Sequence, residues 1–144
     1  MSFYGGGCWW RDWRDSRLPL VRIDIPAGRS AADRAAIAEA VYTSMVEVLK
    51  VPKDDRFEVI AEHSEGELVI DPTYLGIRRS KEAILIQVTL NEGRSLDVKR
   101  AFYRALADGL HEAVGLRRED VLISLVEVKK ENWSFGNGEA QYAE

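Results

Sequence analysis

The sequence predicts an α+β domain in which a strand–helix–strand unit occurs twice and forms a four-stranded sheet with both helices on one face. Two observations lead to this prediction. A pattern of the first half recurs 65 positions later without a gap, and each copy has two apolar strand patterns on either side of one helical pattern. Each unit is expected to have parallel strands and the usual right-handed crossover.

The repeat is clearest at the turn Gly28-Arg29-Ser30, which recurs as Gly93-Arg94-Ser95. Further identical pairs keep the same offset: Leu20 and Leu85, Ala36 and Ala101, Ala40 and Ala105, Glu47 and Glu112, Asp55 and Asp120, Glu62 and Glu127. A short match occurs by chance, but a constant register over this length indicates duplication. We place the halves at about residues 19–83 and 84–144.

The first half begins with a strand pattern at residues 19–25. Ser30 precedes a helical pattern, as an N-cap does, and Pro52 lies just beyond the end of that pattern. A second strand is predicted at residues 57–61. The side chains that recur every four residues, and so face a core, are Ile37, Val41, Met45 and Leu49.

The second half repeats this order, with strands predicted at residues 84–90 and 121–126. Ser95 is the expected N-cap of its helix and Gly115 the expected C-terminal residue. The core-facing stripe is Phe102, Leu106, Leu110 and Val114. Both strands are apolar at almost every position, as in strands buried on two faces, yet the chain has helices for one face only. Other copies of the chain are the expected cover, which predicts a homo-oligomer.

Composition excludes several classes of protein. With 144 residues, 46% hydrophobic and 31% charged, the chain is long enough for one globular domain. A net charge of −4 and a pI of about 5.3 argue against nucleic-acid binding. There is no apolar run of about 20 residues, so we expect no membrane span. Cys8 has no second cysteine to pair with, which favours the reducing cytoplasm.

Arg94 is the first candidate for chemistry, because it stands where a strand meets a helix. Free N–H groups at a helix start attract anions, and a guanidinium grips a carboxylate with two hydrogen bonds. Together they suggest a site for a small carboxylate. The alternative is a glycine turn, a serine cap and an arginine that pairs on the surface, which we favour for Arg29.

Asp55 and its counterpart Asp120 end equivalent helix-to-strand loops. Either could be a turn residue that bonds its own backbone, the better interpretation for Asp120. Asp55 could instead orient a base or activate water. The two histidines, His63 and His111, lack metal-ligand spacing. We therefore predict no metal site, and expect His63 to start a loop in a structural or solvent-facing role.

Trp133 and Phe135 place two large aromatic rings in a glycine-rich segment after the last strand. Such rings close an interface or a core edge, or contact a substrate. Both interpretations stay open at this point.

These residues together resemble the tautomerase superfamily, and most of all its malonate semialdehyde decarboxylase branch. The resemblance covers residues 19–144. It rests on Pro19-Leu20-Val21-Arg22-Ile23-Asp24, the two Gly-Arg-Ser turns, Val51-Pro52 with Asp55-Arg56, Leu75-Gly76-Ile77 and Trp133-Ser134-Phe135-Gly136.

The resemblance implies a homotrimer with the tautomerase fold that needs no metal or cofactor. It implies catalysis by the secondary amine of Pro19 as acid or base, with Asp55 beside it and Arg94 binding the substrate carboxylate. The branch has a second arginine, but here that position holds Asn91. We therefore expect Asn91, Trp133 and Phe135 to contact a small enol or 2-oxo carboxylate. The expected reaction is keto–enol tautomerisation, with decarboxylation as the alternative.

The leader, residues 1–18, departs from the family pattern, because a proline nitrogen inside a peptide bond is neither base nor acid. Translation could start at Leu18 so that Pro19 becomes the first residue, the leader could be cleaved, or it could be permanent. The leader contains the aromatic residues Phe3, Tyr4, Trp9, Trp10 and Trp13. If permanent, it predicts a non-catalytic trimer, a ligand-binding or interaction protein in which the leader blocks Pro19.

Overall fold

The computed structural model describes residues 19–143 of the chain. The aromatic leader and the last residue lie outside this range. The strands are β1 (Leu20–Pro26), β2 (Glu58–His63), β3 (Ile84–Asn91) and β4 (Val121–Val128), and the helices are α1 (Ala31–Val48) and α2 (Leu96–Val114). Short 3₁₀ turns lie at Tyr74–Gly76, Arg118–Asp120 and Lys130–Asn132.

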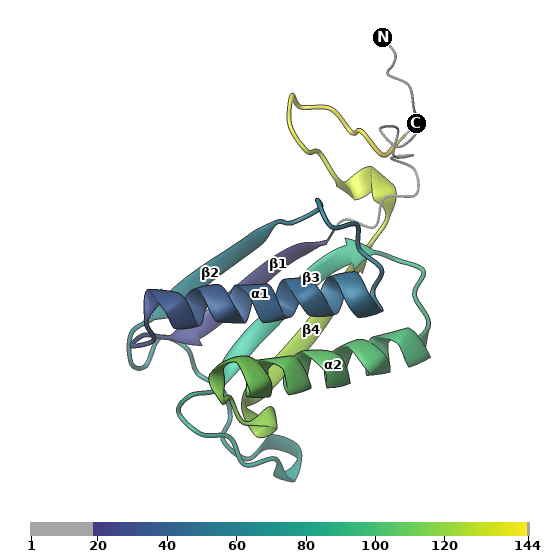
Figure 1. The fold of residues 1–144 in the computed structure, drawn as a ribbon. Coiled ribbons are helices and arrows are strands. Elements are labelled where there is room, and N and C mark those ends of the chain that lie inside the picture. Colours follow the sequence, from purple (N-terminus) through teal and green to yellow (C-terminus); the bar gives the residue numbers. More distant parts are fainter. Residues whose placement is uncertain (1–18, 144) are drawn as a thin grey trace.

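The sheet has the strand order β2-β1-β3-β4. β1 and β2 are parallel, β3 and β4 are parallel, and the central pair β1 and β3 is antiparallel. Both helices lie side by side on one face of the sheet (Figure 1). The predicted fold class, two βαβ units with two helices on one face, is confirmed.

The predicted helix ends are confirmed as well. The Ser30 hydroxyl accepts a hydrogen bond of 3.0 Å from the Asp33 N–H, and the Ser95 hydroxyl accepts one of 3.2 Å from the Val98 N–H. Each bond satisfies one donor that a helix start leaves open. Gly115 ends α2 at φ 69°, a left-handed conformation that glycine adopts without strain.

The core lies between the sheet and the helices. Alternate side chains of β1 and β3 point toward the helices, and they are fully buried: Val21, Ile23, Ile25, Ile84, Ile86, Val88 and Leu90. The predicted stripes of the helices meet them, with Ile37, Val41 and Met45 from α1 and Phe102, Leu106 and Leu110 from α2. Val114 packs at the margin, partly buried.

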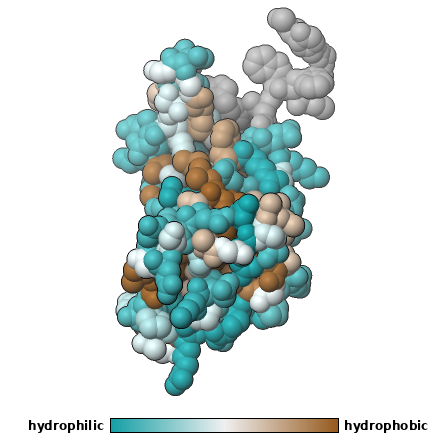
Figure 2. Space-filling view, turned by 90° about the vertical axis from the view of Figure 1, so that its left-hand side faces the viewer, coloured by the Kyte–Doolittle hydropathy of each residue, from teal (hydrophilic) through white to brown (hydrophobic). Residues whose placement is uncertain are grey.

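The opposite face of the sheet has no helix over it within residues 19–143. It carries the alternate side chains, among them Leu20, Val59 and Leu122, which are 41%, 46% and 39% exposed. Polar side chains such as Gln87 and Ser124 stand between them. The left-hand side of the molecule as drawn in Figure 1, which is next to this face, shows hydrophobic areas between hydrophilic ones (Figure 2). This face is therefore half apolar and uncovered in the single chain.

Two expectations about polar residues were wrong. His63 does not start a loop but ends β2; its expected structural role is confirmed, because its Nε2 lies 2.6 Å from Asp24 Oδ1. Burial raises the pKa of Asp24, but hydrogen bonds with His63 and Arg22 outweigh burial and hold that pKa below its usual range. The side chain of Asp120 does not bond the backbone of its own turn; it is 1% exposed and accepts two hydrogen bonds from Ser80, of 2.7 Å and 2.6 Å.

The burial pattern of α2 generates a stability prediction. Leu110 is 0% exposed whereas Leu96, on the same helix, is 58% exposed. Leu110→Ala should lower the free energy of unfolding by about 2–5 kcal/mol, because it removes core contacts and leaves a cavity. Leu96→Ala is the matched control and should change it by less than about 0.5 kcal/mol. Urea unfolding of both variants measures the difference, and equal losses would contradict the assigned core.

Candidate active site

The antiparallel centre of the sheet brings the predicted site residues to one edge. β1 and β2 begin at the edge where β3 and β4 end. Pro19 precedes β1, Asp55 lies just before β2, and Asn91 is the last residue of β3. Arg94 follows in the turn to α2, and the segment with Trp133 and Phe135 follows β4 at the same edge (Figure 1).

Arg94 lies across the junction of the two repeat units. Its Nη1 donates to the Asn91 carbonyl and its Nη2 donates to the Leu49 carbonyl, both at 3.2 Å. Leu49 ends α1, so the guanidinium connects the end of β3 to the loop that carries Asp55. The pKa of Glu127 is lowered, mainly by the hydrogen bond from Lys99. The positive charge of Arg94 contributes a smaller part of this lowering. The guanidinium is thus held beside the start of α2.

The counterpart Arg29 has different surroundings. It pairs with Asp33 at 3.2 Å and with Glu82 at 3.5 Å, and its side chain is 14% exposed. The preferred interpretation of Arg29 as a paired structural residue is confirmed. In the second repeat the position of Asp33 is occupied by Val98. Position 98 therefore offers Arg94 no carboxylate four residues along, whereas the equivalent position 33 offers one to Arg29; the acidic residue in the first turn of α2 is Asp97.

Asp55 and Pro19 are both buried. Asp55 is 5% exposed, and its N–H donates to the Pro52 carbonyl at 3.1 Å in a tight turn. Just after it, the Phe57 carbonyl accepts a hydrogen bond of 2.9 Å from the Val21 N–H. This bond ties the start of β1, and with it Pro19, to the loop of Asp55.

A cluster of charged and aromatic side chains braces that loop against α1. The guanidinium of Arg56 bonds to Glu58 at 2.7 Å and to Glu39 at 2.9 Å, and it lies 4.4 Å above the ring of Tyr42. The Tyr42 hydroxyl donates to the Lys53 carbonyl. The loop is therefore held on both sides of Asp55.

Sequence reasoning missed Glu58 in this cluster. Its side chain is 8% exposed, and its Oε2 is buried without a hydrogen-bond partner among the described residues. Burial raises the pKa of Glu58, and the hydrogen bond from Arg56 offsets this only in part. The alternation of β2 predicts that position 58 points inward, but no pattern indicates that an inward position is charged.

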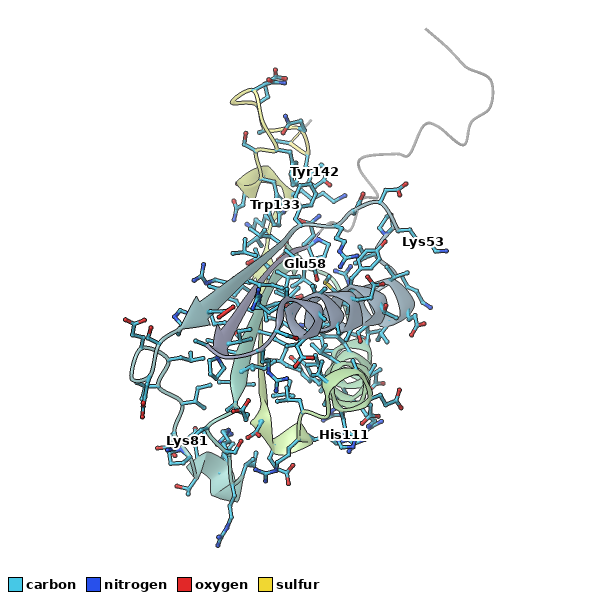
Figure 3. All side chains as sticks on the ribbon, turned by 60° about the vertical axis from the view of Figure 1, so that its left-hand side comes forward. Lys53, Glu58, Lys81, His111, Trp133 and Tyr142 are labelled. Atoms are coloured by element: carbon cyan, nitrogen blue, oxygen red, sulfur yellow. The ribbon has the colours of Figure 1, made fainter. Side chains whose placement is uncertain are left out.

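Aromatic rings form a wall at this edge. Trp133 and Phe135 are stacked, with centroids 5.3 Å apart and an interplanar angle of 14°. Tyr142 meets Phe135 edge-on at 4.9 Å, and Phe57 lies 6.4 Å from Phe135. Trp133 and Tyr142 lie together beyond the end of the sheet (Figure 3). The sequence indicated neither Tyr142 nor Phe57 as a site residue, because Tyr142 is an isolated aromatic and position 57 was predicted only as the start of a strand.

Asn91 joins this wall to the guanidinium. Its side chain is buried, and its Oδ1 accepts a hydrogen bond of 2.7 Å from Trp133 Nε1. Since its backbone carbonyl accepts from Arg94, Asn91 contacts both candidate groups. All six predicted site residues thus belong to segments linked by hydrogen bonds or ring contacts at one edge.

The opposite edge holds a groove of about 740 Å³ between the ends of β1 and β2 and the loop 64–83. His63, Arg79, Ser80 and Lys81 line it, and none of the predicted site residues does. Within residues 19–143, no three or more His, Cys, Asp or Glu side chains are grouped so as to hold a metal ion. In the same range, neither helix has the length and apolar content that crossing a membrane requires.

Comparison with known proteins gives consistent matches. Two family models, both described as tautomerase enzymes, match residues 19–78 and 55–136. The probable tautomerase YusQ of Bacillus subtilis (strain 168) is 40% identical over 127 residues, which are 88% of this chain and 100% of YusQ.

Solved structures extend these matches. The crystal structure of FG41 malonate semialdehyde decarboxylase inhibited by 3-bromopropiolate is 36% identical, with a TM-score of 0.79, over 85% of this chain and 93% of that one. A fused 4-OT that forms a symmetric trimer is 22% identical, with a TM-score of 0.71 over 86% and 98%. This second likeness establishes the shared fold alone.

The cluster around Arg56 generates a prediction of pH dependence. Because the pKa of Glu58 is raised on folding, the folded protein holds a proton that the unfolded chain has released. Wild-type stability should therefore fall as pH rises from about 4.3, the ordinary glutamate pKa, through the raised value. Glu58→Gln lacks this loss, so its free energy of unfolding relative to wild type should increase with pH.

Glu127→Gln is the matched control of opposite sign. The pKa of Glu127 is lowered, so its carboxylate stabilises the folded chain above the ordinary pKa and loses that effect as pH falls. This variant should therefore become less stable than wild type as pH rises. Urea unfolding over a pH series measures both trends, and a difference for Glu58→Gln that stays constant with pH would contradict the assignment.

Proposed function

The chain belongs to the tautomerase superfamily, in the branch of malonate semialdehyde decarboxylase, and from this premise we propose that it catalyses proton transfer on small enol or 2-oxo carboxylates. The proposed reaction is keto–enol tautomerisation, with decarboxylation of a 3-oxo acid as the alternative. The single observation that carries the proposal is the convergence of Pro19, Asp55, Arg94 and the aromatic wall on one edge of the sheet.

Each group has a proposed part. Arg94 binds the substrate carboxylate beside the open N–H groups at the start of α2. The neutral amine of Pro19 accepts the proton of the enol hydroxyl, and the resulting ammonium returns a proton to the neighbouring carbon, so that the ketone forms and the amine is restored. Pro19 is buried in the 144-residue chain, and an amine that is also buried in the chain from Pro19 is favoured in its neutral form, since burial disfavours the charged form.

Asp55 is the proposed partner of that amine, because it is buried in the loop tied to the start of β1. A carboxylate there orients the amine and stabilises the ammonium that forms. Trp133 and Phe135 are proposed to contact the rest of the substrate and to exclude water. The amine exists only in a chain whose first residue is Pro19, so the proposal applies to that form.

We also propose a homotrimer. The helix-free face of the sheet is half apolar, and other copies of the chain are its natural cover. A fused 4-OT with the same fold forms a symmetric trimer, which supports this number of copies.

The catalytic proposal predicts that a chain beginning at Pro19 ketonises enol acids. Pro19→Ala should lower kcat by about 10²- to 10⁴-fold, the usual contribution of a general acid–base. Arg94→Gln should lower kcat/KM by about 10- to 150-fold, as expected for charged hydrogen bonds to the carboxylate. Arg100→Gln is the matched control, because this arginine of α2 is 65% exposed, and it should leave kcat/KM unchanged.

The measurement is the loss of enol absorbance, with release of carbon dioxide from 3-oxo acids followed in parallel. A chain from Pro19 that is inert on both substrate types would overturn the catalytic proposal and favour a non-catalytic trimer that binds a ligand or a partner. The intact mass of protein isolated from its native cells tests the same point. A mass that begins at Pro19 supports the enzyme, and one that includes the leader supports the non-catalytic protein.

A further inference from the structure

We infer that Asn91 sets the substrate preference of this site by fixing the indole of Trp133, so that the site favours enol acids with one carboxylate and a flat apolar tail. The inference rests on the proposed function and adds a substrate class to it. Asn91 acts here as a positioning residue, through Trp133, rather than as a catalytic one.

Asn91 is placed to control two groups at once. It ends β3, is 6% exposed, and is anchored by pairing with Val128 of β4. Its carbonyl accepts from Arg94 Nη1 at 3.2 Å, and its side-chain oxygen accepts from Trp133 Nε1 at 2.7 Å. One buried residue therefore sets the position of the guanidinium relative to the indole.

The indole that Asn91 holds belongs to a flat apolar surface. Phe135 stacks on Trp133 at 5.3 Å, and Tyr142 packs edge-on against Phe135 at 4.9 Å. Trp133 and Tyr142 both lie beyond the end of the sheet (Figure 3). A hydrogen bond to the single donor of an indole fixes the rotation of the ring plane. A planar substrate tail can then stack on a wall of constant orientation.

The charges around Asn91 favour one carboxylate over two. Arg94 contacts Asn91 directly, whereas Arg56, in the loop that carries Asp55, is paired with Glu39 and Glu58. A second carboxylate on the substrate would lie against aromatic rings, and an ion without a partner in an apolar place costs free energy. An apolar tail has no such cost. The site is therefore built for a charged head at Arg94 and an uncharged, flat tail.

The residue at position 91 links the fixed orientation of the Trp133 indole to the preference for a substrate with one carboxylate. An arginine at position 91 would be a hydrogen-bond donor only and could not accept from an indole N–H. Asparagine instead accepts from Trp133 and carries no charge. Asparagine at position 91 thus fixes the indole of Trp133 and adds no positive charge to the site.

The first test is spectroscopic and uses the full chain, whose four tryptophans each give one indole N–H signal. Trp133→Phe identifies the signal of Trp133 by its loss. Asn91→Leu should shift this signal and speed its hydrogen exchange by about 3- to 10-fold, the ratio that one net hydrogen bond corresponds to. Asn91→Asp keeps the acceptor and should restore slow exchange. An unchanged signal in Asn91→Leu would overturn the inference.

The second test measures ligand preference in the same full chain, with two acids that do not react. 3-Phenylpropanoate has one carboxylate and a flat apolar tail, and hexanedioate has a carboxylate at each end. The wild-type Trp133 signal should titrate at lower concentrations of 3-phenylpropanoate. Asn91→Arg should shift the ratio of the two dissociation constants toward hexanedioate by about tenfold or more.

Equal affinity for the two acids in the wild type, no response to either, or an unchanged ratio in Asn91→Arg would each overturn the inference. These outcomes do not depend on turnover, so they are distinct from failure of the proposed function, which is loss of enol ketonisation. In an active chain from Pro19, the ratio of kcat/KM for a phenyl-substituted enol acid to that for an enol dicarboxylate should fall by the same factor in Asn91→Arg.

Discussion

β1 and β3 lie at the centre of the sheet and run antiparallel, with Leu20 opposite Thr89 and Asp24 opposite Leu85. Each is also the parallel partner of the other strand of its own βαβ unit. The strand starts of one unit and the strand ends of the other therefore share an edge. Segments more than 100 residues apart in the chain, such as Pro19 and Trp133, meet there because of this single pairing.

Duplication creates two such edges of the sheet. Equivalent residues at the two edges have different neighbours, and these neighbours decide which edge carries a candidate site. Asp33 and Glu82 neutralise Arg29, whereas the equivalent Arg94 spans two backbone carbonyls. The carboxylate of Asp120 accepts two hydrogen bonds from Ser80. The equivalent residue Asp55 lies in the loop that is hydrogen-bonded to the start of β1. The identity of a residue in both halves of the repeat therefore does not predict its chemical role. That role depends on the ionic and hydrogen-bonding partners of the residue, because they determine what a charged group can still bind.

The candidate site has a rigid frame around it. Arg56 links α1 to β2 through two carboxylates and stacks on Tyr42, while Asn91 links β3 to the segment after β4. Such supports matter because a base or an anion-binding group is effective only when its geometry is held before the substrate arrives. The frame is polar and partly buried, and Glu58 is left with one unsatisfied oxygen among the described residues. Its raised pKa reflects the cost of that burial.

By itself the sequence determined the two βαβ units, the caps at Ser30, Ser95 and Gly115, and the core stripes of both helices, because periodicity and capping are local properties. It also pointed to Pro19, Asp55, Arg94, Asn91, Trp133 and Phe135 as candidates, which the structure gathers at one edge. Only the tertiary structure decided that Asn91 holds Trp133, that Glu58 and Tyr142 lie at this edge, and that His63 pairs with Asp24. These contacts join residues distant in the chain, and no local pattern specifies which distant side chains meet.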